Sequence, residues 1–145
     1  MSTIAANKKA YHNYHIGDIF EVGIKLTGPE VKSIKNGDMS LKESFVHIEN
    51  GQLFIKNMHV GAYKPAHPES YDPTRNRKLL ANKKEIQILA SKLDQKGLSI
   101  VPTKVYLKNG LIKLEIGVAK GKKKWDKRED IKKKDLAKES KKGMI

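Results

Sequence analysis

The sequence contains no cysteine, which excludes disulfide bridges and thiolate metal ligands and is compatible with a reducing cytosol. It also lacks an apolar run of 18 residues and, near its N-terminus, the apolar core of a signal peptide, so we expect a cytoplasmic protein without a membrane partner. Acidic residues are few, since 16 Asp/Glu stand against 30 Lys/Arg and give a formal net charge of +14. Such an excess predicts salt-dependent binding to phosphate backbones.

Motifs for catalysis and for cofactor binding are missing as well. Neither Gly-x-x-x-x-Gly-Lys-Ser/Thr nor Gly-x-Gly-x-x-Gly occurs, and the carboxylates are scattered without a matching nucleophile and base. The histidines follow no familiar metal-ligand spacing; they occupy positions 12, 15, 47, 59 and 67. We therefore predict a binding protein rather than an enzyme, with no catalytic residue, no metal, no cofactor and no small-molecule substrate.

Half of the net positive charge lies between positions 120 and 142, which hold twelve Lys/Arg and five Asp/Glu. The large apolar side chains of this stretch are Trp125, Ile131 and Leu136. They are too few to offset an ordering entropy of roughly 1–2 kcal/mol per residue, so we predict a tail that is disordered alone and becomes helical on a polyanion. An aromatic residue among lysines favours RNA over a membrane surface. The alternative is a solvated tail that only aids solubility.

Alternating apolar and polar residues predict strands over about 11–26, 44–49, 52–60, 98–108 and 111–119. Asn-Gly pairs at 50–51 and 109–110 predict two tight hairpins. Residues 1–6 are expected to fray, and residues 61–74 to form a loop. Short helical turns are expected over 30–35, after Pro29 and before a C-terminal cap at Gly37.

A longer helix is expected where Asn82 and Glu85 form a capping-box pattern, with apolar residues at positions 86, 89, 90 and 93 and an end at Gly97. Another helix start is expected at Asp72-Pro73. It would place Arg75, Arg77 and Lys78 in the first turns, where backbone N–H groups and the helix dipole favour phosphate. The alternative for these residues is a solvated helix end.

This order of elements is five strands with a helix between the third and fourth, the topology of an OB-fold. We therefore predict a mainly β fold with helices: an OB-fold-like closed antiparallel barrel over residues 1–119, followed by a basic C-terminal tail over 120–145. Glu21 would lie on the outer face of the first strand, either paired with a lysine or accepting hydrogen bonds from RNA. Residues predicted in or facing the core are Phe20, Ile24, Val46, Ile55, Leu89, Val105 and Ile116.

Several blocks occur in a fixed order: Asn7-Lys8-Lys9-Ala10-Tyr11-His12, Glu21-Val22-Gly23-Ile24, Gly28-Pro29-Glu30-Val31-Lys32-Ser33, Asp72-Pro73-Thr74-Arg75-Asn76-Arg77-Lys78-Leu79-Leu80, Val101-Pro102, Gly117-Val118-Ala119-Lys120-Gly121-Lys122-Lys123 and Asp126-Lys127-Arg128. In this order and spacing, over nearly everything from Asn7 to Arg128, the chain resembles the bacterial small protein B family, the partner of transfer-messenger RNA. Two positions depart from the family pattern. Ala81 stands where a larger apolar residue is usual, and Trp125 stands where histidine or tyrosine is usual.

The resemblance implies an OB-type barrel that binds the elbow of the tRNA-like domain of transfer-messenger RNA. It also implies that the tail enters the decoding centre of the small subunit and the empty messenger channel of a stalled ribosome, and becomes helical there on ribosomal RNA. The candidate RNA-binding residues are Asn7, Lys8, His12, Glu21, Lys32, Arg75, Arg77, Lys78, Ala81 and Asn82. The candidate ribosome-binding residues are Gly121, Lys122, Lys123, Lys124, Trp125, Asp126, Lys127 and Arg128.

The composition alone leaves two other hypotheses open. A structural ribosomal protein with a basic extension embedded in ribosomal RNA would show the same charge distribution. An RNA-modifying enzyme with an unrecognised site is the third hypothesis. Only the resemblance points to a particular RNA and to delivery for trans-translation, the rescue of stalled ribosomes with tagging of the nascent peptide.

Overall fold

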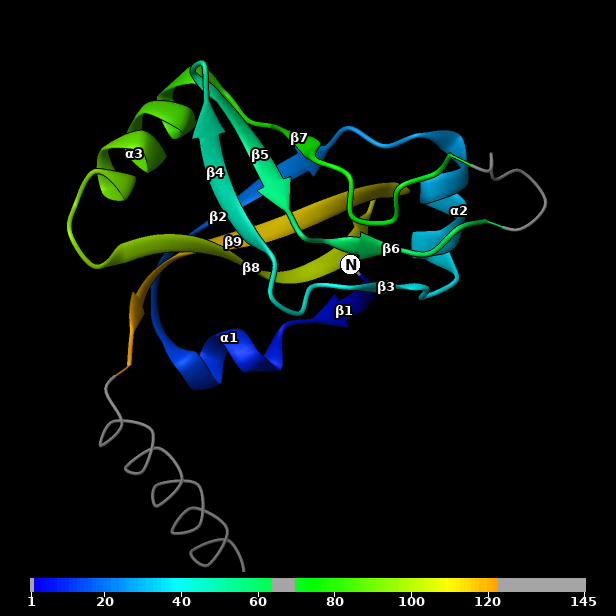
Figure 1. The fold of residues 1–145 in the computed structure, drawn as a ribbon, viewed down its shortest axis with the longest axis horizontal. Coiled ribbons are helices and arrows are strands. Elements are labelled where there is room, and N and C mark those ends of the chain that lie inside the picture. Colours follow the sequence, from blue (N-terminus) through cyan, green and yellow to red (C-terminus); the bar gives the residue numbers. More distant parts are fainter. Residues whose placement is uncertain (1, 64–69, 123–145) are drawn as a thin grey trace, which may run out of the picture.

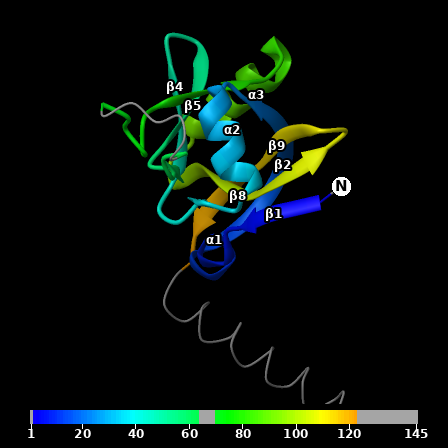
Figure 2. The same ribbon diagram turned by 90° about the vertical axis from the view of Figure 1, so that its right-hand side faces the viewer.

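The computed structural model describes residues 2–63 and 70–122. Its elements in chain order are β1 (Ser2–Ala6), α1 (Lys8–Asn13), β2 (Tyr14–Ile24), α2 (Gly28–Lys35), β3 (Met39–Ser40), β4 (Phe45–Glu49), β5 (Gln52–Lys56), β6 (His59–Val60), β7 (Arg77–Leu80), α3 (Lys83–Leu93), β8 (Leu98–Lys108) and β9 (Leu111–Gly121). This part of the chain is therefore mainly β-structure with helices, as predicted. Figure 1 shows α3 at the left end of the strands and α2 at their right end, with α1 below them, and Figure 2 shows the arrangement with α2 towards the viewer.

Two tight hairpins follow from the Asn-Gly pairs. Asn50 and Gly51 join β4 to β5 with φ angles of 52° and 74°. Asn109 and Gly110 join β8 to β9 with φ angles of 52° and 77°. Two consecutive left-handed residues are what a type I′ turn requires, and this turn matches the natural twist of the flanking strands. Both predicted hairpins are confirmed.

Every pairing between the described strands is antiparallel. The main sheet has the order β1-β8-β4-β5-β7-β2-β9, and β9 also pairs with β8 from Leu111↔Lys108 to Lys120↔Leu98. The pairings thus lead from β8 through β4, β5, β7, β2 and β9 back to β8, while β1 adds to β8 as an extra strand. The short strands β3 and β6 form a separate pair.

The apolar core is built from alternate strand residues together with one side of each of α2 and α3. On β5, Leu53 and Ile55 are fully buried, whereas Phe54 between them is half-buried, as the period of two requires. Ile34 of α2 and Leu89 of α3 are fully buried in the same cluster. Each of the seven residues predicted to face the core lies in this cluster or packs against it: Phe20, Ile24, Val46, Ile55, Leu89, Val105 and Ile116.

The ends of α2 and α3 follow local sequence signals. Thr27 and Glu30 form a capping box at the start of α2, and Asn82 and Glu85 form the predicted one at the start of α3. Gly37 has a φ of 80°, and its N–H donates to Ile34 O at 2.9 Å, as expected for the predicted C-terminal cap. In the part of the chain that the structure describes, no helix is both long enough and apolar enough to cross a membrane.

The N-terminal region differs from the prediction. Instead of fraying, residues 2–6 form β1, which pairs with β8 from Ser2↔Leu107 to Ala6↔Lys104. The strand predicted from residue 11 begins at Tyr14, because Asn7 caps the short helix α1 and accepts a hydrogen bond from the Ala10 N–H at 3.3 Å. The first error concerns a segment whose backbone partners in β8 lie about a hundred residues away, where local sequence patterns carry no signal. The second concerns a local N-cap at Asn7 that the sequence analysis missed.

The helix predicted from Asp72 is also wrong. Residues 77–80 form β7, which pairs with β5 through Arg77↔Ile55 and with β2 through Leu80↔Gly23. The residues of β7 alternate in burial, because Arg77 and Leu79 point inwards while Leu80 is 51% exposed. A buried arginine at an inward position hides the strand pattern, since the sequence alone shows five polar or charged residues, 74–78, before two leucines.

Candidate nucleic-acid interface

The candidate RNA-binding residues that the structure describes fall at the two ends of β2. Asn7, Lys8 and His12 lie on or beside α1, which precedes Tyr14 at one end. Glu21 lies seven residues further along β2, near Gly23, which pairs with Leu80. At a rise of about 3.3 Å per strand residue, the two groups are roughly 20 Å apart. The structure therefore divides the predicted site into two surfaces, which we call the Glu21 surface and the α1 surface.

The Glu21 surface has an acidic group among basic ones. Glu21 Oε2 lies 3.1 Å from Lys108 Nζ, an ion pair between exposed side chains of β2 and β8. Hydrogen bonds from Lys108 and from the Tyr106 hydroxyl lower the pKa of Glu21, and the neighbouring charge of Lys113 acts in the same direction. Burial and the hydrogen bond to Glu21 raise the pKa of Tyr106 to about 12. Glu21 is thus an ionised hydrogen-bond acceptor already oriented by a lysine and a tyrosine.

An apolar groove adjoins Glu21 and was not found from the sequence. It has a volume of about 250 Å³, and its lining includes Gly23, Leu80, Leu111 and Lys113. Leu80 and Leu111 are 51% and 59% exposed, which is unusual for leucines that lie so close together. The sequence did not indicate this groove, because residues 77–80 resemble a helix start and Leu111 directly follows a turn, so nothing places the two leucines on one surface.

The segment after β7 has a structural role in addition to any role in RNA binding. Ala81 packs against the main core, and the Asn82 side chain accepts a hydrogen bond from the Glu85 N–H at 2.8 Å as the N-cap of α3. Lys78, on β7, is half-buried beside Lys25, whose N–H donates to Lys78 O at 2.9 Å. Asn82 is exposed, whereas Lys78 and Ala81 are half-buried, so Asn82 can cap α3 and still face a ligand.

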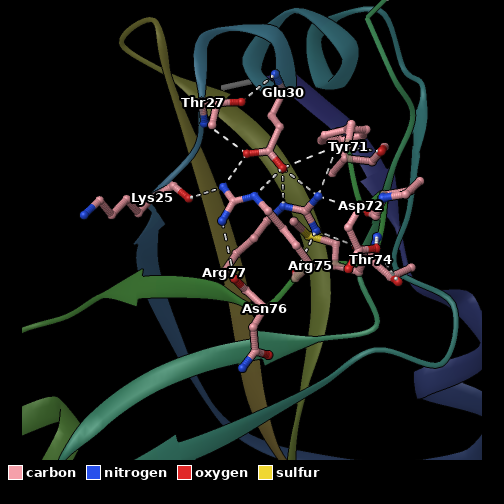
Figure 3. A network of polar contacts seen from close by, with 12 residues as sticks. Lys25, Thr27, Glu30, Tyr71, Asp72, Thr74, Arg75, Asn76 and Arg77 are labelled. Atoms are coloured by element: carbon pink, nitrogen blue, oxygen red, sulfur yellow. Dashed lines mark hydrogen bonds and ion pairs between the residues drawn. The ribbon is translucent and has the colours of Figure 1, made fainter. Parts of the chain in front are cut away.

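Two arginines of the candidate set are held by one buried carboxylate (Figure 3). Glu30 of α2 is fully buried, and its Oε2 accepts hydrogen bonds from Arg75 Nε at 3.0 Å and from Arg77 Nε at 2.7 Å. Its other oxygen, Oε1, is paired with Arg75 and also accepts from the Thr27 N–H at 3.0 Å. Tyr71 donates from its hydroxyl to Val60 O at 2.8 Å and lies beside the same carboxylate. The network therefore fastens the segment before β7 to the start of α2.

The network explains the ionisation of its members. Burial opposes the charge on Glu30, but the hydrogen bonds from Arg75, the Thr27 backbone and Arg77 outweigh it and lower its pKa to about 2. The same hydrogen bond to Glu30 raises the pKa of Arg75, and burial raises that of Tyr71. Glu30 is therefore ionised at neutral pH, and its negative charge lies next to the guanidinium groups that donate to it.

The phosphate site predicted at a helix start is not formed by these arginines. Arg77 has no exposed surface, and its guanidinium also donates to Met58 O at 2.7 Å and to Pro73 O at 3.0 Å. A side chain with all of its donors engaged inside the protein cannot reach a phosphate without breaking this network. The Arg75 side chain is 34% exposed, and Lys32, on the outer side of α2, is exposed, so these two remain accessible.

The α1 surface is organised around a buried asparagine. Asn7 is 7% exposed; its side-chain amide donates to Pro102 O at 2.9 Å, and its backbone N–H donates to Thr103 O at 2.8 Å. Asn7 thus anchors α1 to β8 and has little surface to offer a ligand. Lys8 and His12 project from the same helix and are exposed.

The end of β9 lies beside α1. The Lys122 N–H donates to Asn13 O at 2.9 Å, and Lys122 Nζ donates to Tyr11 O at 3.0 Å. Gly121 pairs with Tyr14 and is exposed. The first residues of the predicted ribosome-binding set are therefore attached to the α1 surface. The rest of that set lies outside the described residues: Lys123, Lys124, Trp125, Asp126, Lys127 and Arg128.

Within residues 2–63 and 70–122, no group of three or more His, Asp or Glu side chains is arranged to hold a metal ion. His47 lies in β4 and His59 in β6, and His67 falls outside the described residues. The structure provides two basic surfaces with hydrogen-bonding and apolar groups, which suit recognition of a polyanion.

Comparisons with known proteins agree on one family. The family model described as SmpB protein matches residues 4–145 of this chain. The chain is 54% identical over 139 residues to the SsrA-binding protein of Persephonella marina, covering 96% of this chain and 91% of that protein. It is 52% identical over 136 residues to the SsrA-binding protein of Shouchella clausii, covering 94% and 87%. A chain in the solved structure "tmRNA-SmpB: a journey to the center of the bacterial ribosome" is 40% identical, with a TM-score of 0.69 over 83% of this chain and 85% of that one.

Proposed function

The chain belongs to the SmpB protein family, and from that premise we propose that it binds the tRNA-like domain of transfer-messenger RNA and delivers it to stalled ribosomes for trans-translation. The observation that carries the proposal is the similarity over nearly the full length to SsrA-binding proteins, together with the likeness to a chain solved with transfer-messenger RNA. The function is one of binding and delivery in the cytoplasm, without a catalytic centre.

The Glu21 surface is the proposed contact with the tRNA-like domain. It combines an ionised acceptor with Lys108 and Lys113 and with the exposed side chains of Leu80 and Leu111. Folded RNA loops offer bases and ribose hydroxyls that donate to a carboxylate, while lysines neutralise the adjacent phosphates. Ala81 and Asn82 lie at the edge of this surface, and the groove beside Leu80 provides apolar contact that Ala81 alone does not.

Within the candidate set we assign two different roles. Lys8, His12, Lys32, Arg75, Lys78 and Asn82 contact RNA directly, because each has an accessible side chain. Asn7 and Arg77 act by holding α1 and β7 in place, because both are buried and hydrogen-bonded to the backbone. Loss of either would therefore reduce RNA binding through the shape of the surface rather than through a lost contact.

We also propose that residues 1–119 form an OB-fold-like closed barrel and that residues 120–145 act as the ribosome-binding tail. The return of the strand pairings from β9 to β8 supports closure. The attachment of Lys122 to Asn13 and Tyr11 supports a tail that leaves the folded part beside α1, roughly 20 Å from the Glu21 surface. With the two surfaces separated, one RNA can be held by the barrel while the tail probes the decoding centre and the empty messenger channel.

Peptide tagging on ribosomes stalled at the end of a message tests the proposal. Wild-type protein should support transfer of the tag from transfer-messenger RNA and should bind the isolated tRNA-like domain in filter-binding assays. A structural ribosomal protein would instead remain with salt-washed subunits in equimolar amount and would not select this RNA. Stoichiometric retention on washed subunits, or no preference for the tRNA-like domain over a tRNA-sized hairpin control, would contradict the proposal.

A further inference from the structure

The outer face of the sheet carries a second carboxylate opposite Glu21. Glu21 of β2 and Glu115 of β9 are Cα partners in the antiparallel register, so both side chains leave the sheet on the same face. Such partners have Cβ atoms about 4.5–5.5 Å apart, and two like charges placed in this way destabilise a sheet. The carboxylates are directed apart by residues of the neighbouring strand, β8.

Glu115 is turned towards Thr103 and Lys104 of β8. Thr103 Oγ1 donates to Glu115 Oε2 at 2.6 Å, and Lys104 Nζ lies 3.8 Å from Glu115 Oε1. Thr103 is buried, and the side chain of Glu115 is 15% exposed. The charge of Glu115 is therefore paired within the protein, and little of its side chain is open to a ligand.

Glu21 is turned the other way along β8, towards Tyr106 and Lys108. Its carboxylate pairs with Lys108 Nζ and accepts a hydrogen bond from the Tyr106 hydroxyl. The Lys108 side chain is 49% exposed, whereas Tyr106 is only 4% exposed. An ion pair between exposed side chains holds its partners weakly, so the buried tyrosine is the firmer of the two constraints on Glu21.

The position of Tyr106 is itself fixed. Its backbone lies inside β8, which is paired there with β9 on one side and with β1 on the other. Lys104 Nζ lies over the Tyr106 ring, 5.6 Å from its centre, where a cation is attracted to an aromatic face. Lys104 thus connects the two carboxylates, because it pairs with Glu115 and also contacts the ring whose hydroxyl holds Glu21.

Glu21 keeps acceptor sites for a ligand. An ionised carboxylate has about four lone-pair sites, and Lys108 and Tyr106 each use one of them. The Glu21 side chain is 35% exposed, so part of the carboxylate is accessible. Its charge attracts hydrogen-bond donors and repels phosphate, so the part of an RNA that fits here is a base edge or a ribose hydroxyl. Because the carboxylate is already oriented, binding does not have to order it.

We propose that Tyr106 is a positioning residue for RNA recognition. Its hydroxyl holds the Glu21 carboxylate away from Glu115, in the orientation that accepts hydrogen bonds from the RNA. The ring of Tyr106 is too deeply buried to contact the RNA itself. The inference rests on the proposed function for its ligand, and it goes further by assigning the orientation of Glu21 to a single hydroxyl group of β8.

Tyr106→Phe removes this hydroxyl and keeps the ring and its contact with Lys104. Filter binding of the tRNA-like domain should weaken several-fold. In the Glu21→Ala background the same substitution should have no further effect, because a residue that acts only through Glu21 has nothing left to position. The slope of log affinity against log salt should stay unchanged, because no phosphate contact is lost, whereas Lys113→Gln should reduce that slope by about one.

A measurement on the free protein separates positioning from a loss of structure. Carbon-13 NMR of the glutamate carboxyl groups reports the pKa of Glu21, which the hydrogen bonds from Lys108 and Tyr106 lower. Tyr106→Phe should raise this pKa towards its usual value, and thermal melting confirms that the variant is folded. Tyr11→Phe is the matched control, because it also removes one tyrosine hydroxyl, but Tyr11 lies on α1 and is 52% exposed. This control should change neither the pKa of Glu21 nor the RNA affinity.

Equal losses of affinity from Tyr106→Phe in the wild-type and Glu21→Ala backgrounds would overturn the proposal, because Tyr106 would then act independently of Glu21. An unchanged affinity of Tyr106→Phe, with Glu21→Ala still weakening binding, would also overturn it and leave the proposed function intact. The proposed function fails instead if the wild-type protein does not prefer the tRNA-like domain over the hairpin control. In that case an unchanged pKa of Glu21 in Tyr106→Phe overturns the positioning role as well, and a raised pKa retains it.

Discussion

Replacing Glu30 by glutamine tests the buried ion-pair network most directly. The carboxylate of Glu30 is fully buried, and it is the shared partner of Arg75 and Arg77. Glutamine keeps the shape of the side chain but leaves the buried Arg77 guanidinium without a compensating charge. Breaking a buried pair by removing one partner costs about 3–5 kcal/mol, so Glu30→Gln should lower the free energy of unfolding by about that amount at pH 7.

The pKa of Glu30 gives an independent estimate. The hydrogen bonds in the folded protein lower this pKa to about 2 from the usual 4.5. At 1.36 kcal/mol for each pKa unit, ionised Glu30 contributes roughly 3 kcal/mol of stability above pH 4.5. Because the folded pKa is the lower one, this contribution is lost as the pH falls from about 4.5 towards 2. Glutamine does not titrate, so the difference between wild type and variant should be largest above about pH 5 and should shrink below it.

Urea denaturation followed by circular dichroism at pH 7, 5, 4 and 3 measures both effects. Glu43→Gln is the matched control, because Glu43 also pairs with a basic side chain but is exposed, and this variant should leave the denaturation midpoint almost unchanged. The reasoning is refuted if Glu30→Gln changes the free energy of unfolding by less than about 1 kcal/mol at pH 7. It is also refuted if the difference from wild type stays constant between pH 7 and pH 3.

Three further predictions concern the two surfaces. Asn7→Ala should lower the free energy of unfolding by about 1–2 kcal/mol in urea denaturation, because a helix cap and a buried hydrogen bond are lost; unchanged stability would contradict the buried role. Glu21→Ala should weaken filter binding to the tRNA-like domain several-fold with little change in melting temperature, and normal binding at several salt concentrations would remove Glu21 from the interface. A chain ending at Lys122 should melt like the full chain and bind the same RNA with a shallower salt dependence, but should not support peptide tagging. Normal tagging by this shortened chain would reduce the tail to a solubility device.

Local signals predicted the elements whose hydrogen bonds close within a few residues. Asn50-Gly51 and Asn109-Gly110 define their turns because both residues adopt positive φ, and this preference belongs to the dipeptide itself. The capping box of Asn82 with Glu85 is equally local. The alternation of apolar residues placed Ile55 and Ile116 in the core, because a strand with one buried face has a period of two in any fold.

Segments that depend on distant partners were predicted poorly. β1 forms because the edge of β8 offers hydrogen bonds to residues 2–6. No pattern within those residues predicts a strand. β7 was read as a helix start because Arg77 resembles a solvated residue in the sequence. It is buried only because Glu30, 47 residues earlier, supplies the compensating charge.

The sequence by itself determined the charge of this protein, its lysine-rich C-terminal stretch, its hairpins and the family to which it belongs, because each of these is a property of composition or of short-range order. Only the tertiary structure decided which candidate residues are buried, which are exposed and which are paired with each other. It buried Asn7 and Arg77, joined Glu21 to Lys108 across 87 residues, and brought Leu80 and Leu111 together in one groove. The physical reason is that exposure and pairing depend on which strands lie side by side, and that arrangement is set by packing over the whole chain.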